Sequence, residues 1–212
     1  MKQYEYVPKE EWKPVKRNLI SIIHEVQNLL RDEFTFSFSF VGSSHRGMIT
    51  REEGGNRGYD FDVDIRVNDD EEEFTAKELK YKIKNALNKV AWRYGYGPCE
   101  DSTRVITMKV IDRLTSRILY GCDFAIVNDY YDEDNNRRQQ FVYYDKTTRE
   151  YLWKDRSREY CNLKKNEALI KQAGKREELK DVYREKKRNN SEEKESRSLY
   201  VEAVHEVVSR LP

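Results

Sequence analysis

The chain has 212 residues, and its formal net charge is only +1 because 40 Lys and Arg residues nearly balance 39 Asp and Glu residues. This length fits one domain, or one compact domain with a helical annex, and the near-zero charge excludes a generally polycationic nucleic-acid coat. There is no long apolar run and no signal-peptide core at the N-terminus, so we expect a water-soluble, cytoplasmic protein without a membrane partner.

The N-terminal region predicts a helix followed by a strand. Apolar residues recur at three- and four-residue steps over residues 12–30, which is the pattern of an amphipathic helix. Residues 34–40 then alternate Phe with Thr or Ser, so four phenylalanines share one face of a strand. We expect this face to pack on the helix.

A small-residue turn comes directly after this strand. Gly42, Ser43 and Ser44 lie where the chain turns and exposes backbone N–H groups and small hydroxyls, an arrangement that suits a polyphosphate. A plain turn is the alternative interpretation.

The next strand carries three alternating acids. In residues 59–67, Asp60, Asp62 and Asp64 share one face, where neighbouring carboxylates lie about 7 Å apart. Their repulsion is costly unless water or a cation offsets it, and Mg²⁺ is commonly held by one or two carboxylates together with substrate phosphates. The pattern therefore predicts a metal–nucleotide site, with a solvated outer strand face as the alternative.

A helix over residues 74–92 and a β-hairpin formed by residues 104–111 and 118–127 follow. Asp123 lies within the apolar second strand of this hairpin, where a carboxylate needs a partner to offset burial. If this strand pairs with the strand of three aspartates, the acids converge. A buried structural aspartate is the alternative.

The rest of the chain is predicted to be largely helical. We expect a polar loop over residues 128–140, a short strand over 141–144, helical segments over 151–153, 163–183 and 199–211, and a mobile polar connector near 184–197. The predicted fold class is α+β, with a mixed β-sheet packed on helices. We expect a core over residues 1–146 and a helical annex over 147–212.

The order of these elements and acids resembles the nucleotidyltransferase superfamily that includes DNA polymerase beta. Within it, the chain is most similar to the branch of oligoadenylate synthetases, cyclic-GMP-AMP synthase and the bacterial cyclic-oligonucleotide synthases. The resemblance covers roughly residues 12–130 and rests on four stretches: residues 40–47, 60–65, 104–111 and 122–127.

The resemblance implies a catalytic, metal-binding triad. Asp60 and Asp62 would coordinate two Mg²⁺ (or Mn²⁺) ions, and Asp123 would complete the triad and help to deprotonate the attacking hydroxyl. Asp62 and Asp64 are the rival metal pair.

The resemblance also assigns nucleotide-binding residues. Gly42 and Ser43 would hold the β- and γ-phosphates of a nucleoside triphosphate, with Ser44 as a supporting donor. Related enzymes stack the nucleobase on an aromatic residue after the third acid, so we expect one of five tyrosines to do so: Tyr130, Tyr131, Tyr143, Tyr144 and Tyr151.

Local charge favours a polyphosphate substrate. Residues 149–188 contain fourteen Lys or Arg and eight Asp or Glu, whereas residues 60–78 contain nine acids and two bases. Lys164, Lys171 and Lys175 could therefore reach phosphates from one helix. A solvated helix with pairs such as Glu167–Lys171 is the alternative.

The predicted function is a Mg²⁺-dependent nucleotidyltransferase that moves NMP from an NTP to a hydroxyl. The acceptor is a second nucleotide, as in oligo- or cyclic-nucleotide synthesis, or else an RNA, a protein or a small molecule. A catalytically silent nucleotide- or RNA-binding module with the same fold is the alternative, and a structural Ca²⁺ site is a third.

Overall fold

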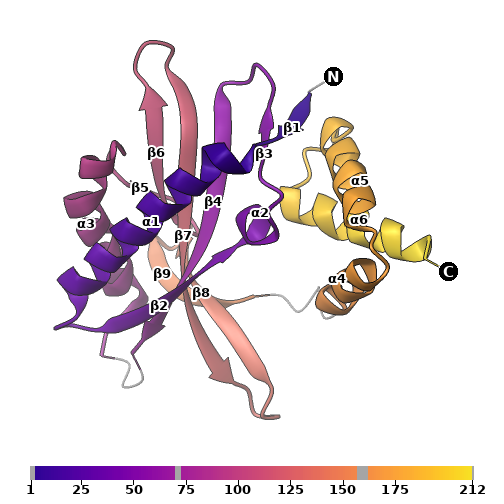
Figure 1. The fold of residues 1–212 in the computed structure, drawn as a ribbon. Helices are drawn as coiled ribbons and strands as arrows, with labels where there is room; N and C mark the ends of the chain where they lie inside the picture. The colour runs from indigo at the N-terminus through magenta and orange to yellow at the C-terminus, as the bar shows by residue number, and fades with distance from the viewer. Residues whose placement is uncertain (1–2, 70–72, 157–161, 212) are drawn as a thin grey trace. The chain divides into compact units, whose positions relative to one another are not determined.

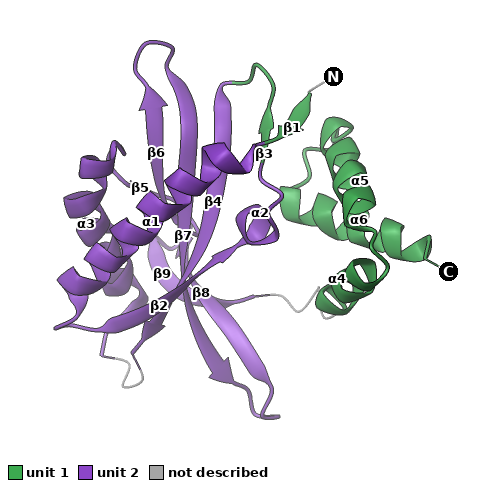
Figure 2. Ribbon diagram, viewed as in Figure 1, with its two compact units in different colours: residues 1–6, 50–55, 157–212 green, residues 7–49, 56–156 purple. Residues whose placement is uncertain are grey.

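The computed structural model describes residues 3–69, 73–156 and 162–211. Contacts divide the chain into two compact units, shown in Figure 2. Unit 1 comprises residues 1–6, 50–55 and 157–212, and unit 2 comprises residues 7–49 and 56–156.

Unit 2 is built on a seven-stranded mixed sheet with the order β2-β4-β7-β6-β5, in which β8 pairs with β7 and β9 with β8 (Figure 1). Strands β4 and β7 are parallel, and the other neighbours are antiparallel. The strands are β2 (Thr35–Val41), β4 (Arg57–Asn68), β5 (Glu100–Asp101), β6 (Ile106–Asp112), β7 (Arg117–Tyr131), β8 (Arg137–Asp145) and β9 (Glu150–Asp155). The helices are α1 (Lys9–Leu30), α2 (Gly42–Arg46) and α3 (Ala76–Ala91), with the 3₁₀ turn η1 (Trp92–Tyr94) after α3.

The core of unit 2 lies between helices α1 and α3 and one face of the sheet. The buried stripes of both helices join Phe61, Val63 and Ile65 of β4 in one hydrophobic cluster. Successive residues of a strand point to opposite faces, so the aspartates that alternate with these residues lie on the other face of the sheet. This division places the acids away from the helices.

Helix α3, which lies between β4 and the hairpin in sequence, begins with a capping box. Thr75 Oγ1 accepts a hydrogen bond from the Glu78 backbone N–H at 3.3 Å, and Glu78 Oε2 accepts one from the Thr75 N–H at 2.8 Å. Both bonds satisfy donors that a helix start leaves open.

Unit 1 contains a two-stranded sheet and three helices. Its strands are β1 (Tyr4–Tyr6) and β3 (Thr50–Glu52), and its helices are α4 (Leu163–Gln172), α5 (Arg176–Arg188) and α6 (Ser196–Ser209). Tyr183 and Tyr200 are buried and pack edge to face, with ring centroids 5.6 Å apart. The Tyr6 hydroxyl donates to the backbone oxygen of Lys180 on α5 at 2.8 Å.

The predicted α+β class, with a mixed sheet packed on helices, is confirmed. The first helix, the phenylalanine strand, the aspartate strand, the second helix and the β6–β7 hairpin also occur where the sequence predicts them. Among the described ranges, no helix combines the length and apolar character that crossing a bilayer requires.

Three local expectations are wrong, and the turn expected at residues 42–44 takes the form of the start of the short helix α2. Residues 151–153 belong to strand β9 and not to a helix, so the sheet continues past residue 146. The loop expected over 128–140 is mostly the β7–β8 hairpin. The helix expected over 163–183 is two helices, separated where Gly174 adopts a φ of +68°.

Regular helix also occupies both ends of the predicted connector, because α5 runs to Arg188 and α6 begins at Ser196. The mobility of residues 189–195 stays a prediction, as does the division into a core and an annex at residue 146.

Candidate active site

Strand pairing brings Asp62 and Asp123 side by side. They are direct partners in the parallel ladder between β4 and β7, the two strands at the middle of the sheet. The row continues outward through Val41 of β2 on one side and Thr107 of β6 on the other. The two acids that the sequence separates by about sixty residues therefore lie next to each other on one sheet face.

Asp60 lies one row along the same face, where its partner on β7 is Gly121. Asp60 is exposed, and Gly121 leaves space beside it: a Cβ atom at residue 121 would lie 2.6 Å from Asp60 Oδ1. Asp60, Asp62 and Asp123 thus share one polar surface across the two central strands.

Gly42 lies against the second acid of the aspartate strand. Its backbone has a φ of +62°, which favours glycine, and a Cβ atom at this position would lie 2.3 Å from Asp62 Oδ2. Ser43 follows in α2 and is half-buried, whereas Ser44 is buried and its Oγ donates to the Val41 backbone oxygen at 3.1 Å. The Gly-Ser-Ser segment is therefore beside the acids, although the Ser44 hydroxyl is already engaged by the backbone.

The two paired acids share an unfavourable electrostatic environment. Burial raises the pKa of Asp62 from 3.8 to about 6, and the charges of Asp123 and Asp60 act in the same direction while Arg46 opposes them. Burial also raises the pKa of Asp123, against the hydrogen bond from Thr107. Because like charges gather on this face, a cation would stabilise the ionised carboxylates.

The third acid of the strand has a different partner. Asp64 is buried, and the Arg156 guanidinium donates to both of its oxygens, Nη1 to Oδ2 and Nη2 to Oδ1, at 2.7 Å each. Arg156 Nη1 also donates to Gln139 Oε1 at 2.6 Å. Asp64 is therefore held by a bidentate ion pair, which distinguishes it from Asp60 and Asp62.

The carboxylates fit a metal ion that takes part of its ligands from elsewhere. Among the residues that the structure describes, no three His, Cys, Asp or Glu side chains form a ready cage around one metal position. Mg²⁺ does not need such a cage, since it usually binds one or two carboxylates together with water and substrate phosphates. Asp62 and Asp123, adjacent and with raised pKa values, meet that requirement.

Strand alternation separates the five candidate tyrosines. Tyr131 and Tyr143 lie on the face of the acids, because Val127, four residues after Asp123, pairs with Phe141. The rings of Tyr144 and Tyr151 are tilted by 45° to each other, with centroids 4.8 Å apart, on the face toward α3. The Tyr130 hydroxyl donates to Asp155 Oδ1. Of the tyrosines proposed to stack a base, only those at 131 and 143 share the acids' face.

The predicted lysines belong to the other unit. Lys164 and Lys171 are exposed on α4, and exposed Lys175 forms an ion pair with Glu178 at 3.2 Å. Their role toward phosphates stays a prediction.

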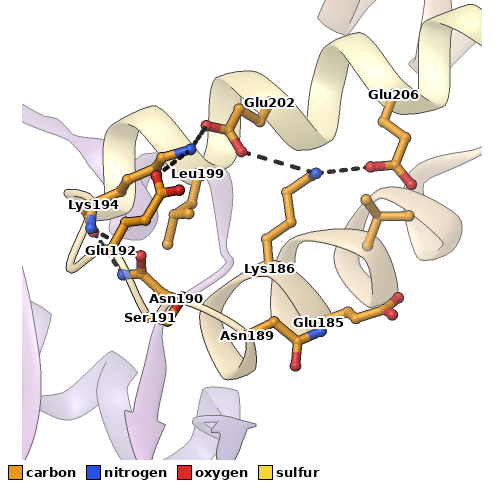
Figure 3. A pocket seen from close by; sticks show the side chains of 11 residues that line it. Glu185, Lys186, Asn189, Asn190, Ser191, Glu192, Lys194, Leu199, Glu202 and Glu206 are labelled. Carbon is orange, nitrogen blue, oxygen red and sulfur yellow. Dashed lines mark hydrogen bonds and ion pairs between the residues drawn. The ribbon is translucent and has the colours of Figure 1, made fainter.

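Unit 1 also contains a pocket of about 300 Å³ between α5 and α6 (Figure 3). Lys186 Nζ lies 2.8 Å from Glu206 Oε2, and Lys194 Nζ lies 3.0 Å from Glu202 Oε1. These charges pair with each other, and no predicted site residue lines the pocket.

Four further polar neighbours of the acids are not among the predicted site residues. Thr107 Oγ1 donates to Asp123 Oδ1 at 2.5 Å, and Lys109 forms an ion pair with Glu100 at 2.7 Å near the same carboxylate. Arg156 is the fourth. Polar residues at alternating positions of strand 104–111 were a usable signal for Thr107 and Lys109, whereas nothing in the sequence pointed to Arg156.

No protein-family model and no curated protein matches the chain. Three solved bacterial structures that match each contain a nucleotide. The 3′-deoxy ATP-bound form of Vibrio cholerae DncV matches with a TM-score of 0.59 and 17% identity, covering 98% of this chain and 54% of that one. Escherichia coli MS115-1 CdnC with ATP matches with a TM-score of 0.57 and 15% identity, covering 99% of this chain and 63% of that one. The CD-NTase CdnG of Bradyrhizobium diazoefficiens with GTP matches with a TM-score of 0.53 and 16% identity, covering 79% of this chain and 49% of that one.

These comparisons confirm the fold expected from the sequence, because the chain shares the fold of the DncV, CdnC and CdnG structures. The chain spans between about half and two thirds of the length of these proteins.

Proposed function

We propose that the chain is a Mg²⁺-dependent nucleotidyltransferase that transfers NMP from a nucleoside triphosphate to a hydroxyl acceptor. The observation that carries this proposal is the in-register pair of Asp62 and Asp123, with Gly42 directly against Asp62. A purely structural sheet has no need for two adjacent, partly buried carboxylates of raised pKa. Nucleotides bound to proteins of the same fold support the substrate class.

In this proposal Asp60, Asp62 and Asp123 hold Mg²⁺ or Mn²⁺. When bound, two such cations polarise the acceptor hydroxyl and neutralise the triphosphate and its leaving pyrophosphate. The ion pair between Asp64 and Arg156 favours Asp60 and Asp62 over Asp62 and Asp64 as the metal pair.

The residues of the chain then supply position and proton transfer. Asp123 accepts the acceptor's proton on a carboxylate oxygen, and Gly42 and Ser43 bring backbone N–H groups to the phosphates. Ser44 contributes through its backbone, because its hydroxyl donates to Val41. Tyr143 is the tyrosine proposed to stack a base, with Tyr131 as the other candidate on that face.

A second nucleotide is the proposed acceptor, because DncV, with the same fold, is a di-nucleotide cyclase. An RNA, a protein or a small molecule as acceptor, and a silent nucleotide- or RNA-binding module, remain the alternatives. A cytoplasmic location also remains a prediction.

The test incubates the full chain with each labelled NTP, and with all four together, in the presence of Mg²⁺ or Mn²⁺. We expect pyrophosphate release that is lost in Asp62→Asn and in Asp123→Asn, and retained in the matched control Asp134→Asn, which replaces an exposed carboxylate on the β7–β8 turn. Mass spectrometry of the products identifies the acceptor. NTP binding without release of pyrophosphate under any of these conditions would favour the silent module.

A further inference from the structure

The third acid of the proposed triad is held by a neighbouring strand. Thr107 on β6 is the direct antiparallel partner of Asp123, and its Oγ1 donates to Asp123 Oδ1 at 2.5 Å. Both side chains are partly buried, which strengthens a hydrogen bond to an ionised oxygen.

The surroundings of Asp123 make this hydroxyl its specific partner. Lys109, the nearby cation, is paired with Glu100 at 2.7 Å, and Glu100 lies opposite Thr107 on β5. The charges of Lys109 and Glu100 act on Asp123 in opposite directions, so they partly cancel there. The hydrogen bond from Thr107 Oγ1 is therefore the directional contact that can fix the orientation of the Asp123 carboxylate.

A carboxylate on a strand can rotate about its terminal torsion, which is broad and roughly two-fold. A hydroxyl bound to one oxygen fixes that rotation and leaves the second oxygen free for a different partner. The orientation of a metal ligand matters, because removing a group that hydrogen-bonds to the ligand typically lowers metal affinity or activity by about 10- to 100-fold.

We propose that Thr107 is a positioning residue that orients the Asp123 carboxylate for divalent-cation binding. The inference rests on the proposed function only in taking Asp123 as a cation ligand, and it concerns a residue that touches neither substrate nor cation. Its contribution is the hydroxyl and not the bulk of the side chain.

The test compares four variants of the full chain. Thr107→Val keeps the shape and removes the hydroxyl, while Thr107→Ser keeps the hydroxyl. Thr107→Ala differs from Thr107→Ser only by that hydroxyl and serves as a second comparison if the valine variant does not fold. Thr115→Val is the matched control, because Thr115 Oγ1 donates to Asp112 Oδ2 at 2.7 Å in the β6–β7 turn.

The first readout is Mn²⁺ binding without nucleotide, followed by electron paramagnetic resonance. We expect the Mn²⁺ dissociation constant to rise about tenfold or more in Thr107→Val and Thr107→Ala, and to stay within roughly threefold of the unmodified protein in Thr107→Ser and Thr115→Val. The second readout is pyrophosphate release, where the metal concentration for half-maximal rate should rise more than the rate at saturating metal falls.

The two proposals fail in distinguishable ways. Mn²⁺ binding that depends on Thr107, without turnover of any NTP, would remove the proposed activity and leave the positioning role intact. Equal Mn²⁺ affinity in Thr107→Ala and Thr107→Ser would overturn the inference about Thr107 even if the enzyme is active.

Discussion

The ion pair between Arg156 and Asp64 gives the sharpest stability prediction. The Asp64 side chain is only 6% exposed and the Arg156 side chain 30%, and two bonds of 2.7 Å join them. Replacing Arg156 by Gln leaves a buried carboxylate without its counter-charge. Breaking such a pair costs about 3 to 5 kcal/mol, and the partial exposure of Arg156 places the expected loss near the lower end, at about 3 kcal/mol.

The chain offers a selective probe for this measurement. All three of its tryptophans, Trp12, Trp92 and Trp153, lie in unit 2. Urea unfolding followed by tryptophan fluorescence therefore reports on the unit that contains the ion pair. A loss of this size corresponds to a Tm lower by about 6 to 12 °C for a domain of this length.

Two variants separate a buried charge from a general surface effect. Arg137→Gln removes a cation that is 66% exposed from Asp129, which keeps Arg66 and Gln139 as donors, so the expected loss is below about 1 kcal/mol. Adding Asp64→Asn to Arg156→Gln removes the unpaired charge and should recover more than half of the stability. A loss below about 1 kcal/mol in Arg156→Gln, or no recovery in the double variant, would refute the reasoning.

Two further predictions concern the paired acids and the glycine beside them. Because the pKa of Asp62 is raised to about 6, its ionised form destabilises the fold above that pH and has no effect below about 3.8. Asp62→Asn should therefore raise the free energy of unfolding by on the order of 3 kcal/mol at pH 8 in the presence of a chelator. Urea unfolding should show this gain shrinking from pH 6 to pH 4. A constant gain across that range would contradict this origin. Gly42→Ala should cost more stability than Gly95→Ala and abolish pyrophosphate release, since both glycines have positive φ but only residue 42 would place a Cβ atom against Asp62. Equal losses in the two alanine variants would show that the close approach to Asp62 has no consequence.

The acids of the site could be predicted from the sequence because their chemistry is local. Alternation alone puts Asp60 and Asp62 on one strand face, and an aspartate in an apolar strand marks residue 123. The register between their strands could not be predicted. In a parallel pair the register is set by the packing of the connecting segment, here helix α3 and strand β6, and not by a tight turn. The sequence therefore predicts that the acids converge only if their two strands pair.

The missed features depend on pairing partners that the pattern of a single segment does not show. Arg156 lies 92 residues from Asp64, and the short segment 151–153 becomes a strand because it pairs with β8. The mostly polar residues of the β7–β8 hairpin predict a loop, but an exposed hairpin tolerates such residues. In each case, pairing with another segment determined the structure more strongly than the local sequence pattern.

The location of the carboxylates on β4 and β7 has a consequence for dynamics. Each of these strands has neighbours on both sides, so the amide groups near the acids can exchange with solvent only when the centre of the sheet opens. Amide hydrogen exchange should therefore be slowest around Asp62 and Asp123. In the proposed enzyme, slow steps of turnover would then arise in the segments around these two strands and not from separation of the paired carboxylates.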